Sequence, residues 1–401
     1  MTRLKLPFAA LLLTSLALAS SIPRSTPAQN ANPKRSVLEL DFSLDAQGRP
    51  LLAWVEQVSA ANHPLFVQRL ERGVWRKLGG ALNVDKGTAA QGVFIRSASS
   101  GTLWAAWSEN GGHADIVQFG QWDGQRWVSQ IKMRQSIDLT YAARSRDLEL
   151  EEDGTPLWVW AEINQTGIAV QTRRWSGLEW TKSAPLSLNS KTIATQPALA
   201  TDKSGARVVV WLEGDAARSS VLVKRWNGKL WDKLGGPLNI RPNTYTFAPT
   251  VQLDVTGQPV VAWLEDRGGA DTLYVKRWTG SSWTLLGDAL NVDPKQFADR
   301  PSLTVHAQNQ PCVVWAEGPE DLKKGYLKCF DGKSWQLERG KALNFTPGSD
   351  LRGPKVVSDG KVLRVVWRER KTVKEVYRMG FSSATLTPSV PTLRLKFPPP
   401  N

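Results

Sequence analysis

The stretch Val251–Asn291 reads VQLDVTGQPVVAWLEDRGGADTLYVKRWTGSSWTLLGDALN, and versions of it recur from Val37 almost to the C-terminus. Four short apolar runs within it are separated by turn residues. Its clearest marker is the tripeptide Trp-x-Glu, which occurs as Trp54/Glu56, Trp107/Glu109, Trp160/Glu162, Trp211/Glu213, Trp263/Glu265, Trp315/Glu317 and Trp367/Glu369. Successive Trp residues are 53, 53, 51, 52, 52 and 52 residues apart. Repeats of this length, with four strands each, are typical of radial β-architectures.

Each repeat carries the same turn signals. Asp254-x-x-Gly257 links the first two apolar runs, since Asp caps a turn and Gly accepts a positive φ. The second run, Pro259–Trp263, is nearly continuous in apolar residues, which predicts a strand buried on both faces. The third and fourth runs are joined by short hairpins such as Trp278-Thr-Gly-Ser-Ser-Trp283. We expect the fourth strand of a repeat to end in Leu-Asn, at Asn83, Asn189, Asn239, Asn291 and Asn344.

These signals predict an all-β fold, a seven-bladed β-propeller with four antiparallel strands per blade. The predicted repeats span about 37–83, 84–136, 137–189, 190–239, 240–291, 292–344 and 345–397. The last repeat lacks its second Trp, so we expect Thr392–Phe397 to supply its fourth strand and close the ring, with 398–401 as a loose tail. A linear solenoid is the alternative, but it needs polar end caps that neither terminus supplies.

The N-terminus predicts export. Arg3 and Lys5 precede an apolar run that ends in small residues near Ala19, as in a secretory signal peptide of residues 1–19, with cleavage after Ala28 as the other candidate. Residues 20–36 then form a disordered leader. No Cys follows the apolar run, which disfavours a lipid anchor, and no later segment is long enough to span a membrane. We expect a monomer that is secreted, periplasmic or held in the cell envelope.

The chain is basic, with a formal charge of +14, and loss of the two cations of the signal leaves +12. This excess favours anionic partners such as acidic glycans or envelope polymers. Lys and Arg are spread over all repeats, and no specific nucleic-acid motif is present.

The hairpin between the third and fourth apolar runs of a repeat resembles part of known propeller motifs. Its Gly-x-x-Trp is similar to the second half of the Asp-box of sialidase-like propellers, although Asp123 and Asp331 directly precede the Gly where the box has its Asp two residues earlier. The Trp pairs resemble those of fucose-binding and tectonin-like lectins. Over about residues 37–397 the chain resembles secreted bacterial β-propellers in general, and no single family closely. The resemblance implies a propeller hairpin.

The Glu residues of Trp-x-Glu have two interpretations. Glu56, Glu109, Glu162, Glu213, Glu265, Glu317 and Glu369 either form a ring of anionic binding sites on one face, or accept backbone hydrogen bonds that join one blade to the next. Their presence in every repeat favours the second interpretation, because a fold needs all of its copies and a function seldom does. By the same argument most Trp residues are predicted to fill the core, with sugar stacking as the alternative.

Catalytic, metal and cofactor signals are weak. His63, His113 and His306 lie in different repeats without metal-ligand spacing, and neither Tyr141 nor Tyr245 stands out as a nucleophile. We therefore predict no metal, no cofactor and no catalytic residue. Cys312 and Cys329 flank one hairpin, where they either form a disulfide or remain buried thiols.

The sequence favours a non-enzymatic binding or scaffold protein that recognises a glycan, an envelope polymer or a protein through the variable loops after Trp-x-Glu. The alternative is an extracellular glycan hydrolase or lyase of the sialidase-like propeller type. A third hypothesis is a structural envelope protein held by its charge.

Overall fold

The computed structural model describes residues 30–110, 115–134, 143–164, 167–181, 185–189, 191–215, 217–372 and 374–385. The expected signal peptide, most of the leader, the closing strand 392–397 and the tail 398–401 lie outside these ranges. The described residues contain strands and two short 3-10 turns, η1 (Ala307–Asn309) and η2 (Glu338–Gly340). None of their helices is long and apolar enough to cross a membrane.

The strands follow the repeat. Each repeat opens with a strand of similar length: β1 (Val37–Leu44), β5 (Ala90–Ser97), β9 (Ala143–Leu150), β12 (Ile193–Thr201), β16 (Thr246–Leu253), β20 (Ala298–His306) and β24 (Asp350–Ser358). The second strands carry Trp-x-Glu: β2 (Pro50–Glu56), β6 (Leu103–Asn110), β10 (Pro156–Asn164), β13 (Arg207–Gly214), β17 (Pro259–Asp266), β21 (Gln310–Glu317) and β25 (Val362–Arg370). The third strands are β3 (Leu65–Glu71), β7 (Asp115–Trp122), β11 (Gly167–Arg174), β14 (Ser219–Trp226), β18 (Asp271–Trp278), β22 (Lys324–Phe330) and β26 (Arg378–Thr385). The fourth strands are β4 (Val74–Lys77), β8 (Trp127–Arg134), β15 (Trp231–Lys233), β19 (Trp283–Leu285) and β23 (Trp335–Leu337).

Consecutive strands pair antiparallel, as the hairpin signals predict. Sheets β1-β2-β3-β4, β5-β6-β7-β8, β16-β17-β18-β19 and β20-β21-β22-β23 have four strands, and the last sheet is β24-β25-β26. One parallel pair, Ile168 with Ile193, joins β9-β10-β11 to β12-β13-β14-β15. Among the described residues of the third repeat, an isolated bridge between Trp175 and Trp180 stands where the neighbouring repeats have a fourth strand.

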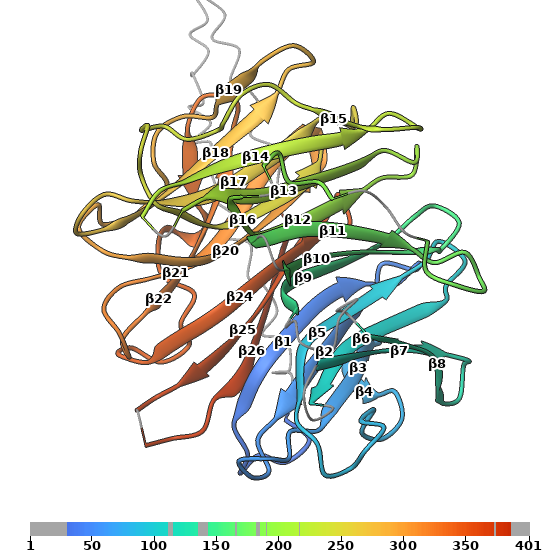
Figure 1. Cartoon of the computed structure of the whole chain (residues 1–401). Coiled ribbons are helices and arrows are strands. Elements are labelled where there is room, and N and C mark those ends of the chain that lie inside the picture. The colour runs from blue at the N-terminus through green and yellow to red at the C-terminus, as the bar shows by residue number, and fades with distance from the viewer. Residues whose placement is uncertain are drawn as a thin grey trace, which may run out of the picture.

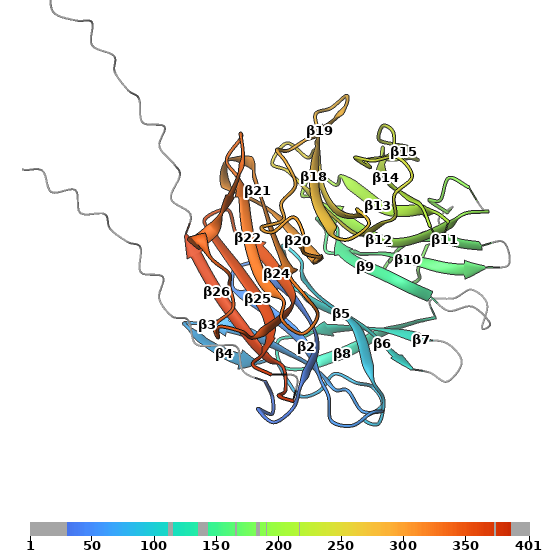
Figure 2. The ribbon, with the colours of Figure 1, turned by 90° about the vertical axis from the view of Figure 1, so that its left-hand side faces the viewer.

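The sheets are packed around a centre that is lined by the first strands. β1 contacts β5, and the contacts continue in order through β9, β12, β16, β20 and β24, which in turn contacts β1. Figure 1 shows the first and last sheets, blue and red, side by side, and Figure 2 shows the third and fourth strands on the outside. Within the described residues no single sheet closes on itself, and the cyclic order comes from packing between sheets.

Each hydrophobic cluster joins two consecutive sheets. One contains Val210 of β13 and Trp263 of β17, and the same arrangement recurs between the other neighbours. Every Trp of Trp-x-Glu lies in one of these clusters with at most 2% of its surface exposed. The prediction that these Trp residues fill the core is confirmed. The second strands are also buried on both faces, as the apolar run of β17 predicts.

The first and last sheets make direct contact. Val366 and Phe381 of the last sheet pack with Leu52 and Trp54 of the first. The N–H of Val37 donates to the carbonyl of Tyr377 over 3.1 Å. These contacts belong to the described residues and do not depend on the segment after Thr385.

Most fourth strands are shorter than expected, and β8, with 8 residues, is the exception. β4 ends at Lys77, and Gly79 then adopts a φ of 81° that an extended strand does not use. The chain pairs with the third strand again further on, where the N–H of Leu82 donates to the Leu65 carbonyl over 2.9 Å. Asn83 contributes its side chain in place of backbone, since its Oδ1 accepts from the Leu65 N–H at 2.8 Å. Asn239, Asn291 and Asn344 make the same contact. At these four positions the Leu-Asn pair is a side-chain cap and not a strand end. Asn189 differs, because its Oδ1 accepts from the Lys191 N–H and Ser187 Oγ accepts from the Val170 N–H in its place.

Candidate functional site

In Trp-x-Glu the two side chains lie on the same face of the second strand, because residues i and i+2 of a strand point the same way. The indole Nε1–H of Trp315 donates to Glu317 at 2.8 Å, and the same bond is present in the repeats of Trp54, Trp107, Trp211, Trp263 and Trp367. The third repeat differs, since no described residue accepts from Trp160 Nε1, while Glu162 is buried like the others.

The same carboxylates accept backbone hydrogen bonds from the segment that precedes their own repeat's first strand. Glu317 accepts from the N–H groups of Val292 at 3.0 Å and Asp293 at 2.7 Å. Equivalent bonds reach Glu56, Glu109, Glu213, Glu265 and Glu369. In six of the seven repeats the Glu therefore holds the segment that leads into its own sheet, which is the geometry of the architectural interpretation. That these residues also bind a ligand stays a hypothesis.

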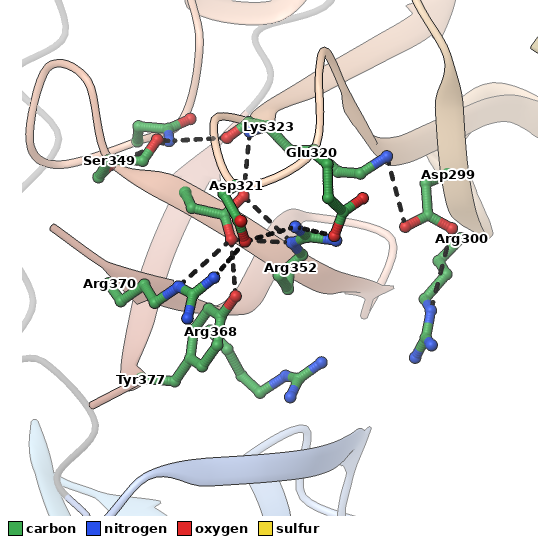
Figure 3. A network of polar contacts seen from close by, with 12 residues as sticks. Asp299, Arg300, Glu320, Asp321, Lys323, Ser349, Arg352, Arg368, Arg370 and Tyr377 are labelled. Carbon is green, nitrogen blue, oxygen red and sulfur yellow. Dashed lines mark hydrogen bonds and ion pairs between the residues drawn. The ribbon is translucent and has the colours of Figure 1, made fainter. Parts of the chain in front are cut away.

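The first strands begin and the second strands end on one face of the molecule, which we call the loop face. A group of polar residues gathers on this face between the last two sheets (Figure 3). We call this group the arginine cluster, and it consists of Asp299, Arg300, Glu320, Asp321, Lys323, Asp350, Arg352, Arg368, Arg370 and Tyr377. These residues come from the starts of β20 and β24, the end of β25 and the loops that follow β21 and β25. Separate stretches of chain therefore meet at one point.

Asp350 is the buried centre of this cluster. Its carboxylate accepts from Tyr377 Oη at 2.6 Å, from Arg352 Nε at 2.9 Å and from the Lys323 N–H at 3.0 Å. Burial alone would raise the pKa of Asp350, but these bonds outweigh it and leave the pKa below its ordinary value. Burial and the bond to Asp350 raise the pKa of Tyr377 to about 12, so its hydroxyl keeps its proton. Asp350 is thus a fixed anion that orients its neighbours.

The other cations of the cluster are paired to different degrees. Arg352 Nη2 lies 2.6 Å from Glu320 Oε1, and Arg370 donates to Asp321. Burial disfavours the charged form of Arg352, yet the bonds to Glu320 and Asp350 raise its pKa above the ordinary value.

Arg368 has no such partner among the described residues. Its guanidinium donates to the carbonyls of Val37 and Leu38 and lies over the ring of Tyr377, 5.4 Å from the centroid. None of the described carboxylates lies within ion-pair distance of it, and it carries no dashed contact in Figure 3. Burial, and then the positive charge of Arg300, lower the pKa of Arg368 to about 10. It is therefore a mostly buried cation with incomplete charge compensation.

Arg300 is the exposed partner of this buried cation. Its side chain is 68% exposed, and its Nε lies 3.9 Å from Asp299. The backbone of Arg300 has a φ of 47°, which is unfavourable for a residue with a Cβ. Pairing of β20 with β21 shifts register between Asp299 and Ser302, so Arg300 sits in a β-bulge.

The bulge recurs at the same place in every first strand. Where the described backbone shows it, the residue with positive φ is Gly92, Gln196, Ala248, Arg300 or Gly353. Gly353 packs beside Arg368, because a Cβ there would lie 3.6 Å from Nη2. Pro follows the bulge residue as Pro197, Pro249, Pro301 and Pro354. This repeated X-Pro is the signal that would have located the loop-face end of the first strands.

A second charged group occupies the centre of the ring. Arg96 donates to Asp41 at 2.6 Å and to Glu149 at 2.9 Å, and its Nη2 lies 3.5 Å from Asp147. Burial raises the pKa of Glu149 to about 7, with repulsion from Asp147 adding to burial and attraction to Arg96 opposing it. Three carboxyl groups thus share one guanidinium.

One carboxyl beside the arginine cluster is also perturbed. Burial, followed by repulsion from Asp266, raises the pKa of Asp271 to about 6, while Lys323 opposes the shift. Lys323 Nζ lies 3.8 Å from Asp299, which itself adds to the shift of Asp271. A carboxyl of this pKa can exchange a proton near neutral pH.

The remaining residues singled out from the sequence are dispersed. His306 is buried with its Nδ1 2.6 Å from Ser358 Oγ, His63 lies near Thr88, and Tyr245 stacks on Phe247. His113 and Tyr141 lie outside the described residues. Cys312 and Cys329 face each other on β21 and β22 and form a disulfide of 2.07 Å. In the part of the chain that the structure describes, no group of three or more His, Cys, Asp or Glu is placed to hold a metal ion.

A cavity of about 430 Å³ lies at the opposite ends of the strands of the first sheet, lined by Arg49, Glu71, Arg72, Val74 and Arg76. Two of its cations are paired, since Arg49 lies 2.6 Å from Asp45 and Arg76 lies 3.5 Å from Glu71. Its remaining cation, Arg72, is exposed to solvent, whereas Arg368 of the arginine cluster is mostly buried.

No protein-family model matches the chain, and no curated protein matches it in sequence. Solved structures match it in fold. An ulvan lyase of polysaccharide lyase family 25, bound to -[GlcA(1-4)Rha3S]-, shares 12% identity at a TM-score of 0.60, covering 90% of this chain and 98% of that one. An α-L-arabinanase from Penicillium chrysogenum complexed with arabinobiose shares 13% identity at a TM-score of 0.53, with the same coverage. A protein of unknown function from Dyadobacter fermentans DSM 18053 shares 12% identity at a TM-score of 0.53, covering 91% of this chain and all of that one. At these identities the likeness shows a common propeller-like, all-β fold.

Proposed function

We propose that this protein is an exported, monomeric seven-bladed β-propeller that binds an acidic glycan at the arginine cluster of its loop face. The blade count rests on the cyclic contacts of the first strands, with blade boundaries as the sequence predicts. Export rests on the N-terminal sequence. The binding proposal is argued from the charges below.

Arg368 is the observation that carries the proposal. A buried guanidinium without a carboxylate is costly, and a carboxylate or sulfate group of a ligand would supply the missing charge. Arg300, exposed beside it, provides a second donor for the same group. Figure 3 shows both guanidinium groups pointing away from the carboxylates around Asp350. Arg368 Nη1 already donates to the carbonyls of Val37 and Leu38, so a ligand would have to meet its other nitrogens.

Two further facts support a glycan as the carrier of that anion. Two structures of similar fold are named as polysaccharide-active, and one was solved with a sugar chain that contains glucuronic acid. The chain itself is strongly basic, which concentrates polyanions near its surface. A neutral-sugar lectin would have no use for this positive charge.

Binding of defined oligosaccharides tests the proposal. Oligogalacturonates and a heparin-derived oligosaccharide are compared with cello-oligosaccharides at low and at physiological salt, by calorimetry. We expect saturable binding of an acidic oligosaccharide that survives physiological salt, and a loss of about tenfold or more with Arg300→Ser, the lower bound for a charge-assisted hydrogen bond.

Arg126→Ser is the matched control. It removes the same charge from an exposed hairpin between β7 and β8, where Arg126 is 82% exposed. If both variants weaken binding equally, or binding disappears at physiological salt, the protein is a charged scaffold and the site is wrong. Saturable binding of a neutral sugar alone also overturns the proposal.

A glycan hydrolase or lyase is the second candidate, and Asp271 favours it. Its pKa of about 6 and its position near Asp299 and Lys323 place a proton-exchanging group beside the proposed ligand site. Reducing-end formation and absorbance of unsaturated uronate are the assays for the two reactions. Turnover that Asp271→Asn abolishes, with binding retained, would establish the enzyme; binding without turnover would leave the binding function alone.

A further inference from the structure

The hairpin between β3 and β4 differs from its counterparts in the other sheets. In the second repeat Trp122 pairs with Trp127 and four residues connect them, and the fourth, fifth and sixth repeats are alike. In the first repeat the pairing continues one step further, to Glu71 and Val74, so that two residues form the turn. The shorter turn follows from its glycine, which lies two residues before Trp75, where its counterparts lie three residues before Trp.

Arg72 occupies a position of this turn that does not suit arginine. Arg72 and Gly73 have φ values of 49° and 80°, and a two-residue turn with both values positive favours Asn, Asp or Gly at its first position. At the corresponding hairpins, the residues with positive φ are Gly124, Gly177, Gly228, Gly280 and Gly332. The side chain of Arg72 is exposed and forms no ion pair or hydrogen bond with any residue that the structure describes. Polar contacts within the fold therefore do not explain an arginine here.

The cavity of the first sheet does offer an explanation. Its volume of about 430 Å³ is in the range of small-molecule binding sites, and Arg72 lines it together with Arg49, Glu71, Val74 and Arg76. The lining thus holds three guanidinium groups and one carboxylate, an excess of two positive charges. Val74, with 54% of its surface exposed, adds an apolar wall beside these charges.

The acidic residues nearby leave this excess in place. Glu71 is held mainly by Arg69, which lies outside the lining and contacts it at 2.5 Å, whereas Arg76 is 3.5 Å away. The hydrogen bond from Arg69 outweighs burial and holds the pKa of Glu71 below its ordinary value. Arg49 contacts the buried Asp45 at 2.6 Å. When Arg69 and Asp45 are counted with the lining, the excess is unchanged.

We propose that this cavity is a second binding site, which takes a sugar-sized organic anion. Arg72 and Arg76 hold its carboxylate, sulfate or phosphate group, and Val74 contacts its body. Such a ligand accounts for the unfavourable φ of Arg72, because strained residues cluster at binding sites. β3 has 7 residues, which at about 3.3 Å per residue places the cavity roughly 20 Å from the loop face. The inference does not rest on the glycan proposal.

Calorimetry with small probes tests the proposal. Glucuronate and glucose 6-phosphate are compared with glucose and inorganic phosphate at physiological salt, in the wild type and in a chain that carries Arg300→Ser to weaken the arginine cluster. We expect saturable binding of a sugar anion in both chains, weaker binding of inorganic phosphate and none of glucose. Absence of saturable binding would refute the site. Inorganic phosphate bound as tightly as the sugar anions would mean an adventitious ion only and would refute a site for an organic anion.

Variants of the hairpin locate the binding. Arg72→Asn removes the charge and introduces a residue that suits a positive φ, so the fold should be kept while affinity falls about tenfold. Arg126→Asn is the matched control, since it removes an exposed charge from the hairpin of the next sheet and should have no effect. Val74→Thr keeps the branched shape, and it should weaken the sugar anion and not inorganic phosphate. Unchanged affinity with Arg72→Asn, or an equal loss with Arg126→Asn, would overturn the proposal.

The outcomes also separate this site from the arginine cluster. Binding that is present in the wild type and lost with Arg300→Ser, but insensitive to Arg72→Asn, would refute the cavity as a site and leave the glycan proposal standing. Binding that persists with Arg300→Ser and is lost with Arg72→Asn would establish the cavity, whatever the loop face binds.

Discussion

Arg96 Nε lies 2.9 Å from Glu149 Oε1 at the centre of the ring, where the first strands β5 and β9 approach each other. Asp41 and Asp147 contact the same guanidinium, so one cation faces three carboxyl groups. Burial raises the pKa of both Asp147 and Glu149, that of Glu149 to about 7, so the two carboxyl groups titrate as a pair and share a proton near neutrality.

The pH dependence of stability follows from this shift. Below its unfolded pKa of 4.5, Glu149 is protonated in both states, and from there to about 7 the folded state holds more proton than the unfolded state. Stability contributed by Glu149 is therefore full below pH 4.5 and is lost as the pH rises through about 7, by at most ~1.4 kcal/mol per pH unit. Urea unfolding of wild type and Glu149→Gln across this range measures it: the wild type should lose stability relative to the variant as pH rises, whereas parallel curves would contradict the protonated Glu149.

Replacing a Glu of Trp-x-Glu should lower the stability of the protein. Glu317→Ala leaves the buried Trp315 indole without its acceptor and removes the acceptor of the N–H groups of Val292 and Asp293, two exposed residues. We expect a loss of about 2 kcal/mol in the free energy of unfolding, because an unsatisfied buried donor costs about 1–3 kcal/mol and water can reach the two exposed N–H groups. Glu179→Ala, at an exposed hairpin, is the control with no effect. A loss similar to the control would mean that water replaces the carboxylate and the ring of Glu is open to ligands.

The Trp-x-Glu contacts and the buried second strands could be predicted from the sequence, because both depend on residues close together in the chain. Trp and Glu two residues apart share one strand face, and an apolar run such as that of β17 has to be buried on both faces. The repeat period then predicts sheets that pack in series. The ends of the fourth strands were harder to predict from the sequence, because the positive φ of Gly79 and the side-chain hydrogen bond of Asn83 replace regular strand pairing there.

The arginine cluster could not be predicted in the same way. Arg300, Arg352 and Arg368 belong to three separate strands, and nothing local distinguishes them among 51 Lys and Arg residues. The X-Pro at Pro301 and its equivalents was visible, but a residue before Pro normally adopts an extended conformation. The left-handed bulge therefore depends on the packing of neighbouring first strands, as when Gln196 Oε1 accepts from the Ala248 N–H at 2.7 Å.

The disulfide provides a further prediction. Cys312 and Cys329 are fully buried and close a loop with a sequence separation of 17. Replacing both with Ala should cost about 3 kcal/mol, chiefly because the unfolded chain gains freedom. Urea unfolding with and without reductant measures this. Reductant should destabilise the wild type alone, and an equal response of the Ala variant would show that the bond does not form.

The backbone of Arg300 leads to a prediction that separates stability from binding. Its φ of 47° is unfavourable for any residue with a Cβ, and Ala248 has a nearly identical φ of 48° at the same bulge of another sheet. Glycine at either position relieves the strain, so Arg300→Gly and Ala248→Gly should each raise the free energy of unfolding by about 0.5–1 kcal/mol after the entropy cost of Gly in the unfolded chain.

Binding distinguishes the two substitutions. Ala248 offers no charged group, so Ala248→Gly should leave affinity for an acidic oligosaccharide unchanged, whereas Arg300→Gly should weaken it about tenfold or more. If replacing a strained residue raises stability but impairs function, the protein keeps that residue for its function. Thermal unfolding and calorimetry on the same preparations measure both quantities. If Arg300→Gly stabilises the protein and binds as before, the strain at this bulge belongs to the fold, as it does at Ala248, and the ligand must contact other residues of the loop face.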